Sequence, residues 1–154
     1  MFEHDLTLEE AIRFSRFDEE HFLSTVSIHS FDLEDYQWPT AEHYYQAHKY
    51  EDKPYAQIIL SAATGQQAHQ LGNRWFKRKV SDWKTKRRVW MTRALYRKTM
   101  EHQDIKQALL ETENALLIET SLYDHYWGIG RDQRGENILG KVWMDIRQKI
   151  NEKE

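Results

Sequence analysis

The segment 36–40 (Tyr-Gln-Trp-Pro-Thr) places the end of an extended stretch directly before the start of a helix. Two aromatic residues flank a polar glutamine, which is the alternation of a half-buried strand. Pro39 biases Trp38 away from helical geometry, and the hydroxyl of Thr40 is suited to cap a following helix. We therefore expect a short strand that leads directly into a helix over residues 41–51.

Glu42 falls in the first turn of this expected helix, and Gln46 follows one turn later on the same side. A surface carboxylate at that place complements the helix dipole. The alternative is a carboxylate at the mouth of a pocket with aromatic walls. The chain has six Trp, eight Tyr and six Phe residues, which either fill a core or stack on a planar ligand. Spacing alone leaves both interpretations of Glu42 open.

The length of 154 residues predicts one domain, residues 1–154. The absence of cysteine excludes a disulfide framework, a thiol nucleophile and a thiolate metal site. No apolar run reaches the length of a membrane span, and the acidic start is unlike a signal peptide. We therefore expect a cytoplasmic protein with no membrane partner, and the sequence does not indicate its oligomeric state.

Positive charge is concentrated in residues 74–98, which carry eleven basic residues and one acidic residue in a chain of formal net charge −3. A general nucleic-acid binder is usually basic overall, so this distribution argues against one. The segment fits a local anion site, such as one for a phosphate, and it equally fits a solvated helix face. Its hydrophobic spacing predicts a helix over residues 82–100, capped by Ser81, with Trp83 and Arg87 on one side.

The hydrophobic periodicity of the chain predicts a mainly α-helical fold with a small β-hairpin or short strands. The expected hairpin joins strands at residues 24–31 and 36–38 through an acidic turn at 32–35, and residues 115–119 form a further strand or a buried extended segment. The expected helices are 5–13, 41–51, 54–63, 66–71, 82–100, 103–111 and 139–150.

Familiar cofactor and metal motifs are excluded by their spacing. Gly128 and Gly130 lack the third glycine of a dinucleotide-binding turn, and the chain has no glycine-rich phosphate loop that ends in Gly-Lys-Ser/Thr. His43 and His48 are five residues apart, so they do not share a helix face as a zinc-binding pair would. We therefore expect neither a cofactor nor a metal.

A second candidate carboxylate, Asp124, lies in the turn-rich segment 121–138 together with Trp127, Gly128 and Asn137. Glycines let the backbone approach a ligand closely, and amides before the terminal helix are suited to hold an anion. The alternative is a connector in which Asp124 and Asn137 merely cap local turns. Trp127, like Trp83, is a core residue by default.

Three separated motifs resemble the NADAR family, and most closely its YbiA-like N-glycosidases. The motifs are Trp-Pro-Thr-Ala-Glu-His-Tyr-Tyr-Gln-Ala-His-Lys-Tyr at 38–50, Asp-x-x-Trp-Gly-x-Gly at 124–130 and Gly-x-Asn-x-Leu-Gly at 135–140. They occur in the order of the family, within a similarity that extends over about residues 14–147. The resemblance implies a mostly helical YbiA-like fold that hydrolyses a bond between a ribose carbon and a base or amine nitrogen.

The resemblance also implies roles for Glu42, Trp83, Asp124 and Trp127, which stand at the positions of the family's functional residues. By analogy with O-glycosidases, two carboxylates divide the work of stabilising an oxocarbenium-like ribose and activating a water. We assign Glu42 to ribose positioning or to the general base and Asp124 to the partner role, and the reverse assignment stays open.

The expected substrate contacts follow from aromatic stacking and positive charge. Trp83 or Trp127 would stack on the base, and Arg87 would hold a 5′-phosphate. The complete substrate-binding set that we predict is Phe14, Ser15, Arg16, Gln46, Trp83, Arg87, Trp127, Gly128 and Asn137.

Arg16 is a departure from the family, which commonly has asparagine between the serine and the second phenylalanine of Phe-Ser-Asn-Phe. An amide offers a donor and an acceptor, whereas a guanidinium only donates. This substitution changes how a substrate would be oriented.

Three functions are compatible with the resemblance. The leading hypothesis is an N-glycosidase that acts on small phosphorylated ribosylamino-pyrimidine intermediates of riboflavin biosynthesis. The second is removal of ADP-ribose from modified guanine in nucleic acid, because a single flipped base needs little duplex contact. The third is a non-catalytic module that binds an ADP-ribose-like ligand, and the presence of both Glu42 and Asp124 argues against it.

Overall fold

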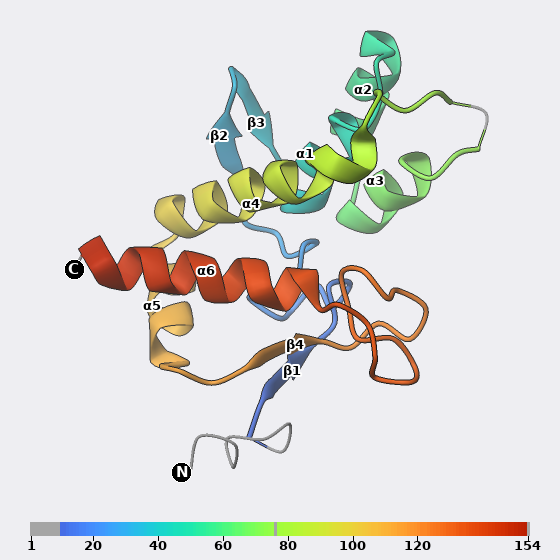
Figure 1. Cartoon of the computed structure of the whole chain (residues 1–154). Helices are drawn as coiled ribbons and strands as arrows, with labels where there is room; N and C mark the ends of the chain where they lie inside the picture. The colour runs from blue at the N-terminus through green and yellow to red at the C-terminus, as the bar shows by residue number, and fades with distance from the viewer. Residues whose placement is uncertain (1–9, 76, 154) are drawn as a thin grey trace. The chain divides into compact units, whose positions relative to one another are not determined.

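The computed structural model describes residues 10–75 and 77–153. Over these residues the chain is mainly α-helical with short strands, as predicted (Figure 1). It divides into two compact units, one made of Met1–Ser24 with Gln103–Glu154 and the other of Thr25–His102. The elements are β1 (Ile12–Phe14), β2 (Phe31–Leu33), β3 (Tyr36–Trp38), α1 (Ala41–Ala47), α2 (Lys53–Leu60), α3 (Gly65–Leu71), α4 (Trp83–Glu101), α5 (Gln103–Glu111), β4 (Leu117–Glu119) and α6 (Ile138–Lys153). One domain over residues 1–154 stays a prediction.

The unit Thr25–His102 contains the predicted hairpin, with β2 antiparallel to β3 and Phe31 opposite Trp38. The prediction of a strand over residues 24–31 was wrong for all but its last residue, because residues 24–28 form a series of bends. The backbone of this segment serves the next helix instead, since the carbonyl oxygen of Thr25 accepts a 2.9 Å hydrogen bond from the amide of Glu42.

Helix α1 lies against α2, α3 and α4 (Figure 1). All seven of its residues are buried, as in a helix that is covered on every side. The hydroxyl of Thr40 accepts a 3.2 Å hydrogen bond from the amide of His43, which confirms the predicted N-cap. The helix ends at Ala47, earlier than predicted, because the chain turns there and Tyr50 then forms a bridge with Lys79.

Helices α3 and α4 differ in how their N-termini are capped. Thr64 caps α3 by accepting a hydrogen bond from the amide of Gln67. The prediction that Ser81 caps α4 was wrong. Asp82 occupies the N-cap position in a left-handed conformation, with φ 58°, and its side chain makes no capping hydrogen bond. Aspartate is one of the residues that adopt this conformation most readily.

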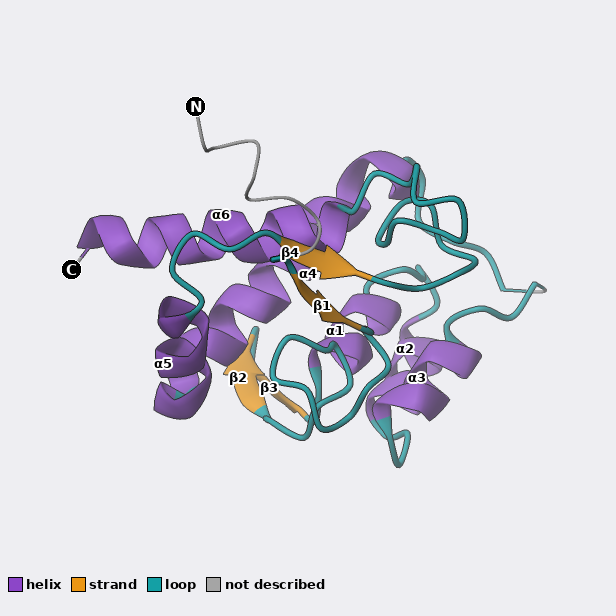
Figure 2. Cartoon of the chain, turned by 90° about the horizontal axis from the view of Figure 1, so that it is seen from below, coloured by secondary structure: helices purple, strands orange, loops and turns teal. Residues whose placement is uncertain are grey.

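The other unit is built on a parallel pairing between β1 and β4, in which Ile12 is opposite Leu117 (Figure 2). Helix α6 packs along β4, and α5 contacts α6. Residues 5–9 of the helix predicted over residues 5–13 lie outside the described part. The remainder of that prediction was wrong, because Ile12 and Arg13 belong to β1. The amide of Ile12 donates to the carbonyl of Leu116 at 2.8 Å, a partner that local periodicity cannot reveal.

Helix α6 contributes much of the core of this unit. Trp143 has no solvent exposure, and its indole Nε1 donates a 2.9 Å hydrogen bond to the carbonyl of Leu23. Val142, Ile146 and Ile150 of the same helix are also buried. Burial of each such side chain contributes roughly 1.5–3 kcal/mol. None of the described helices has the length and apolar character needed to cross a membrane.

Candidate active-site residues

The Glu42 carboxylate is buried in the first turn of α1, with no solvent exposure. Its Oε1 accepts a 2.6 Å hydrogen bond from the hydroxyl of Thr25, and its Oε2 accepts one of 2.6 Å from the amide of Gln46. The Nδ1 of His69 lies 3.2 Å from the same Oε2. Glu42 is therefore a buried and oriented carboxylate, which excludes the interpretation as a surface acid.

The orientation of the Gln46 amide follows from its other neighbour. The ammonium of Lys49 lies 3.3 Å from Oε1 of Gln46. Because an ammonium only donates, the amide oxygen faces Lys49 and the amide NH₂ faces Glu42. Lys49 also donates to the carbonyl of Gly72 at 2.8 Å and to Oδ1 of Asn73 at 3.1 Å. The polar chain from Lys49 through Gln46 thus directs an N–H group at Glu42.

Gly72 makes room for this arrangement. A Cβ atom at Gly72 would lie 2.0 Å from Oε1 of Gln46 and 2.7 Å from its Cβ, which is closer than real side chains approach. Gly72, the C-cap residue of α3, therefore lets α3 approach α1 closely enough to bring His69 to Glu42.

Trp83 and Arg87 lie in the first two turns of α4. Trp83 is buried and packs on Tyr45 of α1, with ring centroids 5.2 Å apart and an interplanar angle of 48°. This contact makes it a core residue of the unit. Arg87 follows one turn later and is half-buried. The stacking of Trp83 on a base and the contact of Arg87 with a phosphate stay predictions.

His43 is held as a neutral ring. Its Nε2 lies 3.0 Å from the carbonyl oxygen of Ala62, which can only accept, so Nε2 carries the hydrogen. Its Nδ1 then accepts from the hydroxyl of Thr40 at 2.8 Å. Burial lowers the pKa of His43 below the ordinary value of 6.5, although the Ala62 carbonyl and Glu42 oppose this shift.

A cavity of about 590 Å³ in the unit Thr25–His102 has aromatic walls. Its lining residues are Glu34, Tyr36, Trp38, Ala47, His48, Tyr50, Glu51, Lys53, Ala56, Gln57, Val80 and Trp90. Glu42 is not among them, so it does not lie at the mouth of this aromatic pocket. Instead, Glu42 faces α3 through His69.

Asp124 belongs to the other unit, where its side chain accepts hydrogen bonds from backbone amides in the loop between β4 and α6. Its Oδ1 accepts hydrogen bonds from the amides of Tyr126 and Trp127 at 3.0 and 2.7 Å. This is the local capping role considered from the sequence. Its Oδ2 lies 3.7 Å from Nη1 of Arg16, so one carboxylate oxygen is occupied by backbone and the other faces a cation.

Arg16 is 2 % exposed, and its guanidinium lies over the rings of Phe17 and Trp127, at 5.0 and 5.7 Å from their centroids. Cation–π contacts of this kind favour a positive group in a desolvated place. Of the two residues before it, Phe14 is buried in β1, and the hydroxyl of Ser15 accepts from the amide of Phe17 at 3.2 Å.

Glu119 is a buried carboxylate that the sequence analysis missed. Its Oε2 accepts from the amide of Arg16 at 2.8 Å and from the hydroxyl of Ser121 at 2.7 Å, and its Oε1 accepts from the amide of Ser121 at 2.9 Å. The signal was an acidic residue at the end of the apolar run 115–119, where a buried strand was expected. A charge in that place needs several hydrogen-bond donors.

Gly128 and Asn137 attach the loop to β4. A Cβ at Gly128 would lie 2.2 Å from Oε1 of Glu119, so only glycine fits there without movement. Oδ1 of Asn137 accepts from the amide of Glu119, and its Nδ2 donates to the carbonyl of Leu117, both at 2.9 Å. The Asn137 amide thus has a structural role, and its contact with a substrate stays a prediction.

Comparisons with known proteins agree with the motifs. The NADAR domain family matches residues 2–151. An N-glycosidase of Nostoc punctiforme is 37 % identical over 82 % of this chain and 83 % of its own length. A riboflavin biosynthesis protein of Vibrio vulnificus is 32 % identical over 94 % of this chain, which spans 40 % of that protein. The solution structure of the Escherichia coli protein YbiA superposes with a TM-score of 0.84 at 30 % identity, covering 93 % of this chain and 86 % of that one.

Proposed function

Because the chain belongs to the NADAR family and is an N-glycosidase, we propose that it hydrolyses the ribose–nitrogen bond of phosphorylated ribosylamino-pyrimidines of riboflavin biosynthesis. The name of the similar Vibrio vulnificus protein supports this choice of pathway. The observation that carries the proposal is the Glu42 carboxylate, which is buried and oriented by Thr25 and Gln46.

The hydrolysis needs one group that accepts a proton from water and one that stabilises the ribose as its bond to nitrogen breaks. The hydroxyl of Thr25 holds Oε1 of Glu42 and the amide of Gln46 holds Oε2, each at 2.6 Å, so the carboxylate has a fixed direction. An ionised carboxylate in a fixed direction can accept a proton from a water placed beside it. We assign Glu42 to the general base or to ribose positioning.

Asp124 takes the partner role in this proposal. Its Oδ1 is held by two backbone amides, so the carboxylate has a defined direction before substrate binds. Arg16 faces its Oδ2 and would set the orientation of an anionic substrate in place of the family's asparagine. Trp83 or Trp127 would stack on the pyrimidine, and Arg87 would contact the 5′-phosphate.

The test is the release of ribose 5-phosphate from the ribosylamino-pyrimidine 5′-phosphate by purified protein. We expect wild-type turnover, and we expect Glu42→Gln to lower kcat by roughly 10²–10⁴-fold, because a charged oxygen that accepts protons is replaced by an amide. Circular dichroism should be unchanged. Glu51→Gln is the matched control, since Glu51 is an exposed carboxylate of the same unit.

The same assay decides between substrates and roles. Absence of ribose 5-phosphate with wild-type protein would exclude this substrate. Turnover of ADP-ribosylated guanine in DNA, without turnover of the pyrimidine, would replace it with the second hypothesis. Binding of both ligands without product would identify a non-catalytic module. A fully active Glu42→Gln variant would remove Glu42 from the mechanism.

A further inference from the structure

We propose that His69 transfers the catalytic proton between the buried Glu42 carboxylate and solvent, so that Glu42 returns to its ionised form after each turnover. His69 lies on α3, outside the sequence motifs that predicted the active site. The inference rests on the proposed function in one respect, which is that Glu42 accepts a proton during the reaction.

Glu42 is buried, so a proton on its carboxylate has no direct access to solvent. The Glu42 side chain has no exposure to solvent, whereas the side chain of His69 is 35 % exposed. A buried base that has taken a proton needs a neighbour that can pass it on. Of the hydroxyl, amide and imidazole groups of Thr25, Gln46 and His69, the imidazole is the type of side chain that serves as a proton shuttle.

The geometry allows the proton to sit on either side of the contact. Nδ1 of His69 and Oε2 of Glu42 are 3.2 Å apart. The amide NH₂ groups of Gln46 and Asn73 also face Nδ1, at 3.2 and 3.4 Å, and both only donate. The neutral ring therefore carries its hydrogen on Nε2, and its Nδ1 can accept the proton of a protonated Glu42. The Gln46 amide holds Oε2 in place, because its oxygen is directed at Lys49 and its NH₂ at Glu42.

Helix α3 presents His69 in a fixed position. Thr64 caps the helix, and Nδ2 of Asn73 donates to the backbone carbonyl of His69 at 2.6 Å. Helices α1 and α2 are the elements that pack on α3. The titratable side chains that contact α3 from these elements and the residues after α1 include Glu42, Lys49, Tyr50 and Tyr55.

Those other titratable groups are directed at the end of α3. Lys49 and Tyr50 donate to the carbonyl of Gly72, and Tyr55 donates to that of Leu71. Burial raises the pKa of Tyr50 to about 12, so this phenol stays neutral in the range in which an imidazole titrates. The Glu42 carboxylate lies against the His69 ring, with Oε2 3.2 Å from Nδ1.

The proton balance of the step is closed. Water attacks the ribose carbon as the bond to nitrogen breaks, and one water proton goes to Oε2 of Glu42. That proton then passes to Nδ1 of His69, which becomes an imidazolium. The imidazolium releases one proton to solvent or buffer and returns to the neutral form with its hydrogen on Nε2, while the departing nitrogen takes up one proton from the medium. No oxidant, reductant or further reactant is needed.

The kinetic test compares His69→Gln, His69→Ala and wild type in the ribose 5-phosphate assay between pH 5.5 and 9. We expect kcat of His69→Gln to fall roughly tenfold or more while KM changes less than about twofold, because the proton and not the substrate is affected. The near-neutral dependence of kcat on pH should be lost. Added imidazole should restore kcat of His69→Ala in proportion to its concentration.

His48→Gln is the matched control, because His48 also forms a histidine–glutamate pair in this unit, with Nε2 2.8 Å from Oε1 of Glu34. We expect this variant to keep the wild-type kcat and pH profile. A kcat of His69→Ala that is low but insensitive to imidazole indicates a purely structural role and overturns the inference. So does a pH profile of His69→Gln that matches wild type.

A second measurement separates failure of the inference from failure of the proposed function. The titration of the His69 ring is followed by nuclear magnetic resonance in wild type and in Glu42→Gln, without any substrate. We expect the midpoint to move when the facing carboxylate becomes an amide. Identical midpoints overturn the inference even if the enzyme is active, and a shifted midpoint with no turnover of the pyrimidine rejects the substrate alone.

Discussion

The backbone amide of Arg16 donates a 2.8 Å hydrogen bond to the Glu119 carboxylate, across 103 residues of sequence. The same carboxylate accepts two further hydrogen bonds from Ser121 and has no exposure to solvent. Glu119 therefore joins the segment just after β1 to the residues after β4 that lead into the loop with Asp124. The first prediction concerns this buried charge.

Glu119→Gln should lower the free energy of unfolding by about 1–3 kcal/mol, because its NH₂ group must face an N–H or O–H donor and leaves that donor unsatisfied. Urea denaturation measures the change. Glu152→Gln, an exposed position near the end of α6, is the control and should stay within about 0.5 kcal/mol of wild type. Equal stability of Glu119→Gln and wild type would contradict the structural role of the carboxylate.

Gly128→Ala should also destabilise the protein, by about 1–3 kcal/mol, because the added Cβ would lie 2.2 Å from Oε1 of Glu119. The clash is specific, so a double-mutant cycle with Glu119→Ala checks it. In the Glu119→Ala background, Gly128→Ala should cost less, with an interaction energy of roughly 0.5–3 kcal/mol. Additive effects of the two substitutions would show that the glycine is required for another reason.

His43 should make stability depend on pH. Burial lowers its pKa, so the unfolded chain binds a proton at a pH at which the folded chain does not. Its contribution is complete above the unfolded value of about 6.5 and is lost as pH falls below that value toward the folded pKa. Protonation would also put a hydrogen on Nδ1, where the hydroxyl of Thr40 already donates.

Thermal unfolding at several pH values between 5 and 7.5 measures this effect. Wild type should lose stability toward pH 5, and His43→Gln should show a smaller slope even if its stability at pH 7.5 is lower. His125→Gln removes a ring that is 54 % exposed and should keep the wild-type slope. An unchanged slope in His43→Gln would assign the pH dependence to other groups.

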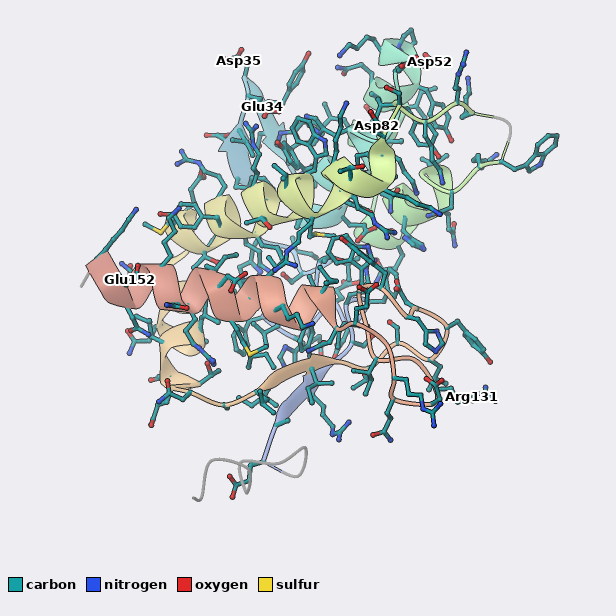
Figure 3. The ribbon with its side chains drawn as sticks, in the orientation of Figure 1. Glu34, Asp35, Asp52, Asp82, Arg131 and Glu152 are labelled. Atoms are coloured by element: carbon teal, nitrogen blue, oxygen red, sulfur yellow. The ribbon has the colours of Figure 1, made fainter. Side chains whose placement is uncertain are left out.

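Asp35→Gly should stabilise the β2–β3 hairpin. Glu34 and Asp35 form its turn with φ values of 56° and 71°, and Figure 3 shows both side chains at the end of the hairpin. The left-handed conformation costs a residue with a Cβ about 1–2 kcal/mol, which glycine avoids at a smaller entropic cost. We expect a gain of about 0.5–1 kcal/mol in chemical denaturation. Asp35→Ala keeps the Cβ and should give no gain.

A glycine at position 34 is not expected to stabilise the hairpin in the same way, because the Glu34 carboxylate makes contacts with other side chains. It accepts from the hydroxyl of Tyr44 at 2.9 Å and pairs with His48 and Arg93. These contacts hold the residue in its strained conformation. Glu34→Gly should therefore be less stable than Asp35→Gly, although both remove a left-handed residue with a side chain.

Signals that act within a few residues predicted the structure well. The Thr40 cap and the strand at residues 36–38 are present as expected, and Pro54 stands in the first turn of α2. Each depends on backbone angles or on a hydrogen bond to an adjacent turn. These signals needed no knowledge of the remainder of the chain.

The wrong predictions of a helix over residues 5–13 and of a strand over residues 24–31 share one cause, which is a backbone partner far away in sequence. Residues 12–14 form a strand that pairs with residues 117–119, where a helix was expected. In the segment after Ser24, the carbonyl oxygen of Thr25 accepts a hydrogen bond from the start of α1, where a strand was expected. Glu119 was missed for the same reason, since its Arg16 partner is 103 residues away.

By itself, the sequence determined that Glu42 stands in the first turn of a capped helix, with Gln46 one turn later, because helical spacing and the Thr40 hydroxyl act locally. Only the tertiary structure decided that this carboxylate is buried between Thr25 and His69. Burial depends on the surfaces that cover a helix, and those surfaces come from segments 17 residues before Glu42 and 27 residues after it.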